Sequence, residues 1–489
     1  MKRDLITIDD LSNSEIESIF ELADDILLKM GVANEDASPP FKVKGRLNLA
    51  EDCILAALFH EPSTRTKFSF ESAMIRLGGS VLSFDDPATT SIAKGETIAD
   101  TVRVIQNYSD LIVIRHPWEG AAQIAAEYTD IPVINAGDGS HEHPTQTLCD
   151  LYTLRREKKS LADLNVLLCG DLKNGRTIHS LVYALARFGA NIIPAPAQGL
   201  ELPSHVTNRL RTDYHCYPVP VKEFEDMCDG LFEGMAQIDV LYITPERAHQ
   251  QTVLPLPEFQ LDLRLKVVKN FKGNAFDVCY VTRLQNERLT NGENGNVRSY
   301  PIVDSNFLKE KKYKATQVLH PLPRVDELSY DLDNDPRGAY FKQASYGVPL
   351  RMALMATLLH LNAKSHNFRI PVFPARRTNR ECYAVYSRSD GILCSNLRCV
   401  TNQESERRYL LSKFWVVLNE PLTIRCSYCE FETQPELIGN ASSRTYSTDT
   451  FLFGDLAADD RVIFSNKDQA RDEGFHAGAI VNAKGAEIS

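Results

Sequence analysis

The chain has 489 residues, of which 43% are hydrophobic and 24% are charged, as is ordinary for a soluble globular protein. Acidic residues outnumber basic ones, 65 to 54, and the formal net charge of -11 argues against broad, non-specific nucleic-acid binding. No apolar run reaches 18 residues, and the opening MKRDLITIDD lacks the apolar core of a signal peptide. We therefore expect a cytoplasmic protein without a membrane span, of about three domains.

Strand-like and helix-like segments alternate along the first three quarters of the chain. Apolar residues at helical spacing predict a helix over 16–27, and Ser14 with Glu17 has the pattern of a capping box. The apolar run 53–59 predicts a buried parallel strand, followed by a helix over 68–77. The same alternation predicts strands at 111–114, 133–134 and 166–168, and helices at 177–188 and 346–361. This order is typical of an α/β fold with parallel sheets.

The composition changes after residue 363. Residues 364–440 are rich in arginine, cysteine and short β-type runs, whereas residues 441–489 are polar and acidic, with disorder or a small strand addition both open. Earlier in the chain, DVLYITP at 239–245 resembles DVCYVTR at 277–283. Two similar strands in one sheet and a duplicated segment both explain this echo.

The strongest local signal is FHEPSTRTK at 59–67, between a predicted strand and a predicted helix. The first backbone N–H groups of a helix are unpaired and form an anion site with the helix dipole. The hydroxyls of Ser63, Thr64 and Thr66 add donors, and Arg65 adds a planar fork suited to phosphate. Alone, the segment is better explained by an N-cap beside a solvated arginine.

Polar side chains also follow other predicted strands. Arg115 ends one strand, His143 and Gln146 follow the next, and Lys94 lies in the small-residue loop 91–97. Ligands of open parallel sheets bind at the carboxyl ends of the strands, so these positions predict one small anion site. Farther along, Arg176, Arg283 and the loop His320-Pro-Leu-Pro-Arg324 repeat the pattern. One phosphate cluster and separate arginine sites suggest two substrates, one with a phosphate and one with carboxylates.

Five of these segments together resemble the aspartate/ornithine carbamoyltransferase family, in family order and over about residues 1–363: STRT (63–66), RHP (115–117), HPTQ (143–146), GRT (175–177) and HPLPR (320–324). Thr282-Arg-Leu-Gln285 is similar to the aspartate branch, and the ornithine branch carries a cysteine where this chain has Pro321. The resemblance implies two α/β lobes with parallel sheets, a carbamoyl-phosphate-binding lobe and an aspartate-binding lobe that make N-carbamoyl-L-aspartate for pyrimidine synthesis. The expected boundaries are 1–145 for the first lobe, 146–340 for the second and 341–363 for a closing helix.

The resemblance also implies roles for individual residues. The phosphate is held by Ser63, Thr64, Arg65 and Thr66, and the carbamoyl oxygen is polarised by Arg115, His143 and Thr66; Arg65, Thr66, Arg115 and His143 are the expected catalytic residues. The carbamoyl amino group is held by Gln146 and the carbonyl oxygens of Pro321 and Leu322. The carboxylates of L-aspartate are held by Arg176, Arg283 and Gln285. Ser91 and Lys94 resemble residues donated by a neighbouring subunit, so a homotrimer or higher homo-oligomer with shared sites is implied.

Some positions depart from the family pattern or stay open. Lys67 stands where the family usually has a second arginine. The stretch after Arg176 is longer than the family pattern, with extra material near 246–275. Glu61 either pairs with Arg176 and Arg288 across the lobes or is solvated.

Four of the 11 cysteines form two close pairs, C-x4-C and C-x2-C, at Cys394, Cys399, Cys426 and Cys429. This pattern predicts a tetrahedral structural zinc site, and no organic cofactor is expected. The segment, with CSYCE at 426–430, resembles the zinc domain of the regulatory chain of the same family, here fused to a catalytic chain. Residues 362–393 are too few for that chain's nucleotide-binding domain, and the tail 441–489 stays unassigned.

Other functions were weighed against this one. A carbamoyltransferase for another amine is a close alternative, which Arg283, Gln285 and Pro321 disfavour. A non-catalytic scaffold is disfavoured by the intact phosphate motif. A nucleic-acid-binding zinc ribbon, suggested by Arg376, Arg377 and Arg380, is disfavoured by the negative net charge. The expected partners are therefore carbamoyl phosphate and L-aspartate, without nucleic acid or membrane.

Overall fold

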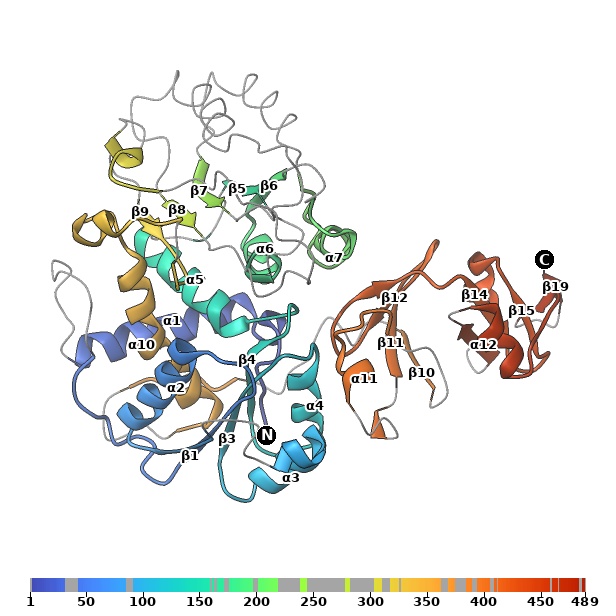
Figure 1. Cartoon of the computed structure of the whole chain (residues 1–489), viewed down its shortest axis with the longest axis horizontal. Helices are drawn as coiled ribbons and strands as arrows, with labels where there is room; N and C mark the ends of the chain where they lie inside the picture. The colour runs from blue at the N-terminus through green and yellow to red at the C-terminus, as the bar shows by residue number, and fades with distance from the viewer. Residues whose placement is uncertain are drawn as a thin grey trace.

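The fold is described from a computed structural model of the whole chain (Figure 1). The structure describes residues 2–30, 43–84, 91–158, 161, 165–170, 176–196, 201–218, 238–243, 278–281, 303–309, 317–324, 327–361, 368–373, 384–388, 394–404, 409–410, 412–457, 460–464, 466–482 and 486–488. Within these ranges, no helix combines the length and the apolar character that crossing a membrane requires.

The first lobe is built on a four-stranded parallel sheet in the order β2-β1-β3-β4. Its strands are β1 (Ile54–Phe59), β2 (Ser80–Ser83), β3 (Leu111–His116) and β4 (Val133–Asp138). Its connecting helices are α2 (Thr64–Leu77), α3 (Ile98–Ile105) and α4 (Ala121–Glu127). The central strands are buried, as expected for apolar runs in a covered parallel sheet. The predicted strands at 53–59, 111–114 and 133–134 and the α/β class are confirmed.

The predicted capping box of the first helix is wrong by two positions. The backbone N–H of Glu15 donates to the Ser12 hydroxyl at 3.2 Å, and the Glu15 carboxylate accepts from the Ser12 N–H at 2.8 Å. The sequence contains two overlapping S-x-x-E patterns, and Ser14 with Glu17 is the second of them. Arg3 donates to both Glu15 oxygens at 2.9 Å, which stabilises the earlier box.

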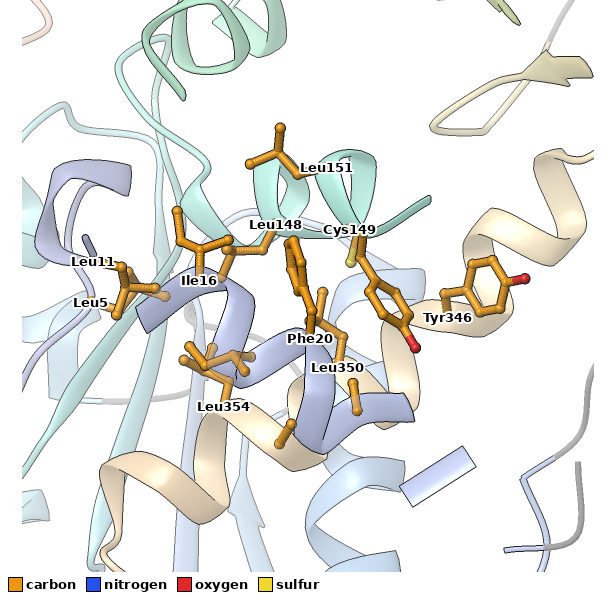
Figure 2. Close-up of a cluster of buried hydrophobic side chains, with 14 of the residues drawn as sticks. Leu5, Leu11, Ile16, Phe20, Leu148, Cys149, Leu151, Tyr346, Leu350 and Leu354 are labelled. Carbon is orange, nitrogen blue, oxygen red and sulfur yellow. The ribbon is translucent and has the colours of Figure 1, made fainter. Parts of the chain in front are cut away.

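Three helices form the core beneath the first sheet: α1 (Asn13–Lys29), α5 (Pro144–Lys158) and α10 (Tyr340–Leu358). Figure 2 shows Phe20 of α1 between Leu148 of α5 and Leu350 of α10. The rings of Phe20 and Tyr152 lie 5.2 Å apart, and those of Tyr152 and Tyr346 lie 5.4 Å apart. The helix predicted over 346–361 thus begins earlier, at Tyr340, and returns from the second lobe to pack on the first.

The second lobe contains a five-stranded parallel sheet in the order β6-β5-β7-β8-β9. Its elements are β5 (Asn165–Gly170), α6 (Arg176–Arg187), β6 (Asn191–Pro196), α7 (Ser204–Tyr214), β7 (Ile238–Ile243), β8 (Val278–Val281) and β9 (Gln317–Leu319). Strands β7 and β8 are neighbours, with Tyr242 beside Tyr280. The two echoing segments are therefore neighbouring strands of one sheet, as the first explanation expects. The extra segment near 246–275 lies outside the described residues.

The C-terminal part forms two small β units, drawn in orange and red in Figure 1. The first, called the metal unit here, contains the four predicted metal ligands and β10 (Ala384–Arg388), α11 (Val400–Gln403), β11 (Ser412–Asn419), β12 (Leu422–Cys426) and β13 (Glu432–Thr433). The second comprises β14 (Leu437–Asn440), β15 (Thr445–Ser447), β16 (Arg461–Phe464), α12 (Lys467–Asp472), β17 (His476–Ala477), β18 (Ile480–Val481) and β19 (Glu487–Ile488). Tyr446, Phe464 and Phe475 belong to its small core. Of the two expectations for the tail, the structure shows strands and not disorder in the parts that it describes.

Candidate active site and metal centre

The segment predicted to bind phosphate forms the turn from β1 into α2. Ser63 precedes the helix, and Thr64, Arg65 and Thr66 form its first turn. Thr66 is buried, whereas Thr64 and Arg65 are exposed. The first N–H groups of a helix have no partner within the helix, and together with the helix dipole they favour an anion here. The N-terminal end of α2 therefore suits a phosphate group.

Arg65 joins this turn to the loop that follows β9. Its guanidinium donates to the carbonyl oxygen of Leu322 at 2.8 Å. Leu322 has a φ of 56°, and both Pro321 and Leu322 are half-buried. The segment predicted to hold the phosphate and the loop predicted to hold the carbamoyl amino group therefore meet in space.

Arg115 and His143 come together around Gly137. Both side chains are buried, and Arg115 donates to the carbonyl oxygen of Ala136 at 3.1 Å. A Cβ atom on Gly137 would lie 2.8 Å from Nη1 of Arg115 and 3.4 Å from Cδ2 of His143. Gly137 also has a φ of +117°, which glycine adopts without strain. A residue without a side chain at this point lets the two donors lie side by side at the end of the sheet.

Glu61 pairs with Arg115 in this structure. The Glu61 carboxylate lies 3.1 Å from the Arg115 guanidinium, within the first lobe. The alternative partners proposed from the sequence were Arg176 and Arg288; the side chain of the former and the whole of the latter lie outside the described residues. A ligand oxygen that approaches Arg115 must therefore share its guanidinium with the Glu61 carboxylate or displace that carboxylate.

Two histidines beside Arg115 are uncharged at neutral pH. The rings of His60 and His116 lie 4.6 Å apart, and the Trp118 N–H donates to Nδ1 of His116 at 3.1 Å. Burial lowers the pKa of His60 to about 4. Burial, and then the nearby His60, hold the pKa of His116 well below its usual value. The positive charge of this strand end therefore resides on Arg115.

The remaining predicted site residues are placed only in part. Gln146 lies in the first turn of α5, where its amide nitrogen donates to Asp150 at 2.8 Å. Ser91 and Lys94 are exposed, and neither side chain forms a hydrogen bond or ion pair with a residue that the structure describes. The three residues predicted to bind the aspartate carboxylates have no described side chain: Arg176, Arg283 and Gln285.

The four cysteines of the metal unit form one buried cluster: Cys394, Cys399, Cys426 and Cys429. The sulfurs of Cys394 and Cys429 lie 3.5 Å apart, and those of Cys399 and Cys426 lie 3.9 Å apart. Four thiolates bound at about 2.3 Å to one tetrahedral zinc ion lie about 3.8 Å from one another, so the cluster fits such an ion. Burial raises the pKa of Cys426 and Cys429, and only a bound cation would favour four thiolates.

The metal unit is docked on the first lobe through the loop after β3. The Glu119 N–H donates to the Arg398 carbonyl at 2.9 Å, and the Val400 N–H donates to the Glu119 carbonyl at 2.8 Å. The Arg398 guanidinium donates to the hydroxyl of Ser140 at 2.8 Å. Ser140 lies three residues before His143, so the metal unit borders the loop that carries a predicted catalytic residue.

The metal unit also contacts the second lobe. Arg209 of α7 is buried and pairs both with Asp9 of the first lobe and with Glu430 of the metal unit. Arg425 of β12 pairs with Asp213 of α7 at 2.8 Å. Burial alone would lower the pKa of Arg425, but Asp213 and Glu432 outweigh it and raise the pKa, so the cation stays charged in the interface.

Sequence reasoning missed residues that shape this site. Asp150 lies four positions after Gln146 on one helix face, a spacing at which side chains meet, so a helical-wheel argument finds it. Gly137 follows a predicted strand, where a glycine signals close backbone approach. Gln343 of α10, which also contacts Asp150, has no local sequence signal.

Three family models match the chain. The carbamoyl-phosphate-binding domain of aspartate/ornithine carbamoyltransferase matches residues 3–156, and the aspartate/ornithine-binding domain matches residues 265–358. The metal-binding domain of the aspartate carbamoyltransferase regulatory chain matches residues 388–438.

Similar proteins and structures agree with these models. The aspartate carbamoyltransferase catalytic subunit of Clostridium acetobutylicum is 42% identical over 362 residues, 73% of this chain and 98% of that protein. The catalytic subunit of M. jannaschii aspartate transcarbamoylase matches with a TM-score of 0.51 and 36% identity, over 73% of this chain and 98% of that one. The Trypanosoma cruzi enzyme in complex with carbamoyl phosphate and aspartate matches with a TM-score of 0.53 and 34% identity, over 72% and 96%.

Proposed function

The chain belongs to the aspartate/ornithine carbamoyltransferase family, and from that premise we propose which of its residues carry out the reaction, and in what assembly. Its reaction transfers the carbamoyl group of carbamoyl phosphate to the amine of L-aspartate, which yields N-carbamoyl-L-aspartate and phosphate in de novo pyrimidine biosynthesis. The observation that supports the proposed site best is the convergence of Arg65 with Leu322, and of Arg115 with His143.

The first lobe binds carbamoyl phosphate. Residues 63–66 hold the phosphate through hydroxyls, the Arg65 guanidinium and the N-terminal N–H groups of α2. Thr66, Arg115 and His143 donate to the carbamoyl oxygen. When the uncharged amine of aspartate attacks the carbamoyl carbon, negative charge grows on this oxygen, and donors already in place stabilise it. The departing phosphate accepts the amine proton, so no separate base residue is needed.

Specificity for the two substrates rests on the remaining residues. Gln146 and the carbonyl oxygens of Pro321 and Leu322 accept hydrogen bonds from the carbamoyl amino group. Arg176, Arg283 and Gln285 of the second lobe bind the two carboxylates of L-aspartate, with arginine forks suited to such anions. Holding both substrates in one cleft makes the reaction effectively unimolecular.

The active assembly is a homotrimer or a higher homo-oligomer, in which Ser91 and Lys94 complete the site of a neighbouring chain. Both side chains are exposed and have no partner among the described residues of the same chain, which supports this assignment. Phe68 and Ile75 of α2 are 60% and 52% exposed and share one helix face, which supports a contact between copies.

The metal unit holds one structural zinc ion through Cys394, Cys399, Cys426 and Cys429. Four thiolates suit a closed tetrahedral site, in which zinc stabilises a small β unit and takes no part in the chemistry. The cysteines whose side chains the structure describes form no disulfide, which together with the biosynthetic reaction supports a cytoplasmic location.

An activity assay on the purified full chain tests this function. We expect carbamoyl-aspartate to form from carbamoyl phosphate and L-aspartate. We expect no product from L-ornithine, because the proposed second-lobe residues bind two carboxylates and ornithine has one carboxylate and a cationic side chain. Light scattering of the same sample should give the mass of a trimer or of a multiple of it. Product formation from ornithine alone, or a monomer with full activity, would contradict the proposal.

Gly137→Ala is expected to lower the turnover number about 10²-fold. The added Cβ atom displaces Arg115 and His143, and misplacing catalytic groups by about 1 Å has an effect of this size. The matched control is Gly474→Ala, since Gly474 also has a positive φ, +81°, but no atom lies within 4 Å of its added Cβ. Steady-state kinetics and thermal melting of both variants check the prediction. Equal activity in the two would show that Arg115 and His143 need not lie at Gly137.

A further inference from the structure

A buried carboxylate orients the amide of Gln146. The side-chain nitrogens of Gln146 and Gln343 both donate to Oδ1 of Asp150, at 2.8 and 2.9 Å. Asp150 and Gln343 are 1% and 2% exposed. An ionised carboxylate only accepts hydrogen bonds, so both amides must turn their nitrogens towards it. The oxygen of Gln146 therefore faces away from Asp150 and is available as an acceptor.

The same hydrogen bonds continue from Gln343 into the loop after β9. With its nitrogen on Asp150, Gln343 presents its oxygen to the backbone N–H of His320, which donates at 2.9 Å. The N–H of Leu322 donates to Nδ1 of His320 at 2.7 Å, which places the ring proton on Nε2, 2.8 Å from Glu327. Burial lowers the pKa of His320, in keeping with a neutral ring that can accept at Nδ1.

This loop presents a second acceptor to the site. The N–H of Leu322, held by His320, fixes the peptide group that carries the Pro321 carbonyl, and the next carbonyl, that of Leu322, accepts from the Arg65 guanidinium at 2.8 Å. Asp150 and Gln343 thus stand between the two acceptors, the oxygen of Gln146 on one side and the carbonyl of Leu322 on the other.

We propose that Asp150 and Gln343 are positioning residues that present two acceptors, and no donor, to the amino group of carbamoyl phosphate. They make the site selective for an acyl phosphate that carries N–H groups over one of the same shape that does not. This inference rests on the proposed function, because it assigns Gln146 and Leu322 to the carbamoyl amino group. A site with oriented acceptors rejects an analogue without donors, since the acceptors are then left unpaired.

The test compares carbamoyl phosphate with acetyl phosphate, in which a methyl group replaces the amino group. For each form of the full chain, kcat/KM is measured for carbamoyl phosphate, together with the inhibition constant of acetyl phosphate as a competitor. Gln343→Met keeps the length of the side chain but loses the donor to Asp150 and the oxygen that His320 uses. We expect it to lower kcat/KM about tenfold or more, while the inhibition constant changes less than about twofold.

Two further variants complete the design. Asp150→Asn keeps the volume and one acceptor oxygen but adds a donor, so a smaller loss in the same direction is expected. Thr357→Val is the control: Thr357 is buried on the same helix, and its hydroxyl donates to the Ala353 carbonyl at 2.8 Å, away from the site. Both constants should match those of the unmodified chain in this control.

The outcomes separate the two proposals. If Gln343→Met weakens both compounds equally, or neither, these residues do not select for the amino group and the inference is overturned. If circular dichroism shows that Gln343→Met does not fold, unchanged constants in Asp150→Asn overturn it instead. An unmodified chain that makes no carbamoyl-aspartate contradicts the proposed function, whatever the variants do.

Discussion

Alanine in place of Arg65 is expected to remove most of the turnover and to leave the fold intact. Arg65 combines a charged planar fork at the N-terminus of α2 with a hydrogen bond to the Leu322 carbonyl. Removing one such preorganised donor lowers activity about 10²–10³-fold. Because the side chain is exposed, the free energy of unfolding should change by only about 0.5 kcal/mol. The measurements are kcat/KM for carbamoyl phosphate and thermal melting.

Two other variants sharpen this test. Arg65→Lys keeps the charge but loses the two-pronged geometry, so its activity should lie between those of Arg65→Ala and the unmodified chain. Arg471→Ala removes another exposed arginine, on α12 in the C-terminal unit, and should have no effect on the kinetics. Near-normal turnover in Arg65→Ala would remove Arg65 from the site.

Cys399→Ser is expected to empty the metal site and to destabilise the metal unit. The four sulfurs are buried together, and loss of one thiolate leaves an incomplete tetrahedron. Structural zinc contributes apparent free energies of about 10–16 kcal/mol to the folding of small domains, so the effect should be large. Phe414 and Ile424 of the metal unit share a hydrophobic core with residues of the first lobe, so its loss also exposes apolar surface there.

Metal analysis, thermal melting and limited proteolysis check this expectation. Cys216→Ser is the matched control, because Cys216 is half-buried outside the cluster and its sulfur contacts the Ala190 carbonyl only at 3.9 Å. This control should keep one metal ion per chain. A stoichiometric metal content and unchanged melting in Cys399→Ser would mean that the four cysteines do not form the binding site.

The sequence was most informative where the rules of parallel sheets apply. Carboxyl ends of parallel strands share one edge, so Arg115 and His143 could be placed together before their contact with Gly137 was known. The spacing of the cysteines likewise predicted one cluster, which the structure contains. The catalytic roles of these residues remain predictions until the variants are measured.

Other features could not be read from local pattern. Gln343 reaches Asp150 only because α10 returns to pack on α5, a tertiary contact that no spacing within either helix encodes. Of the two overlapping capping boxes, the correct one is stabilised by Arg3, a residue outside the helix. The strands of the polar tail could not be predicted from its composition, because a few dispersed apolar residues suffice for a small core, among them Tyr446 and Phe475.

Because the metal unit and its docking surface belong to the same polypeptide, dilution of the protein does not separate them. Arg398 and Val400 meet Glu119 of their own chain, so the association is intramolecular. A short tether gives such partners an effective concentration on the order of millimolar, whatever the concentration of the protein. The ratio of metal units to catalytic lobes is therefore fixed at one to one by synthesis, and this contact needs no balanced supply of a second chain.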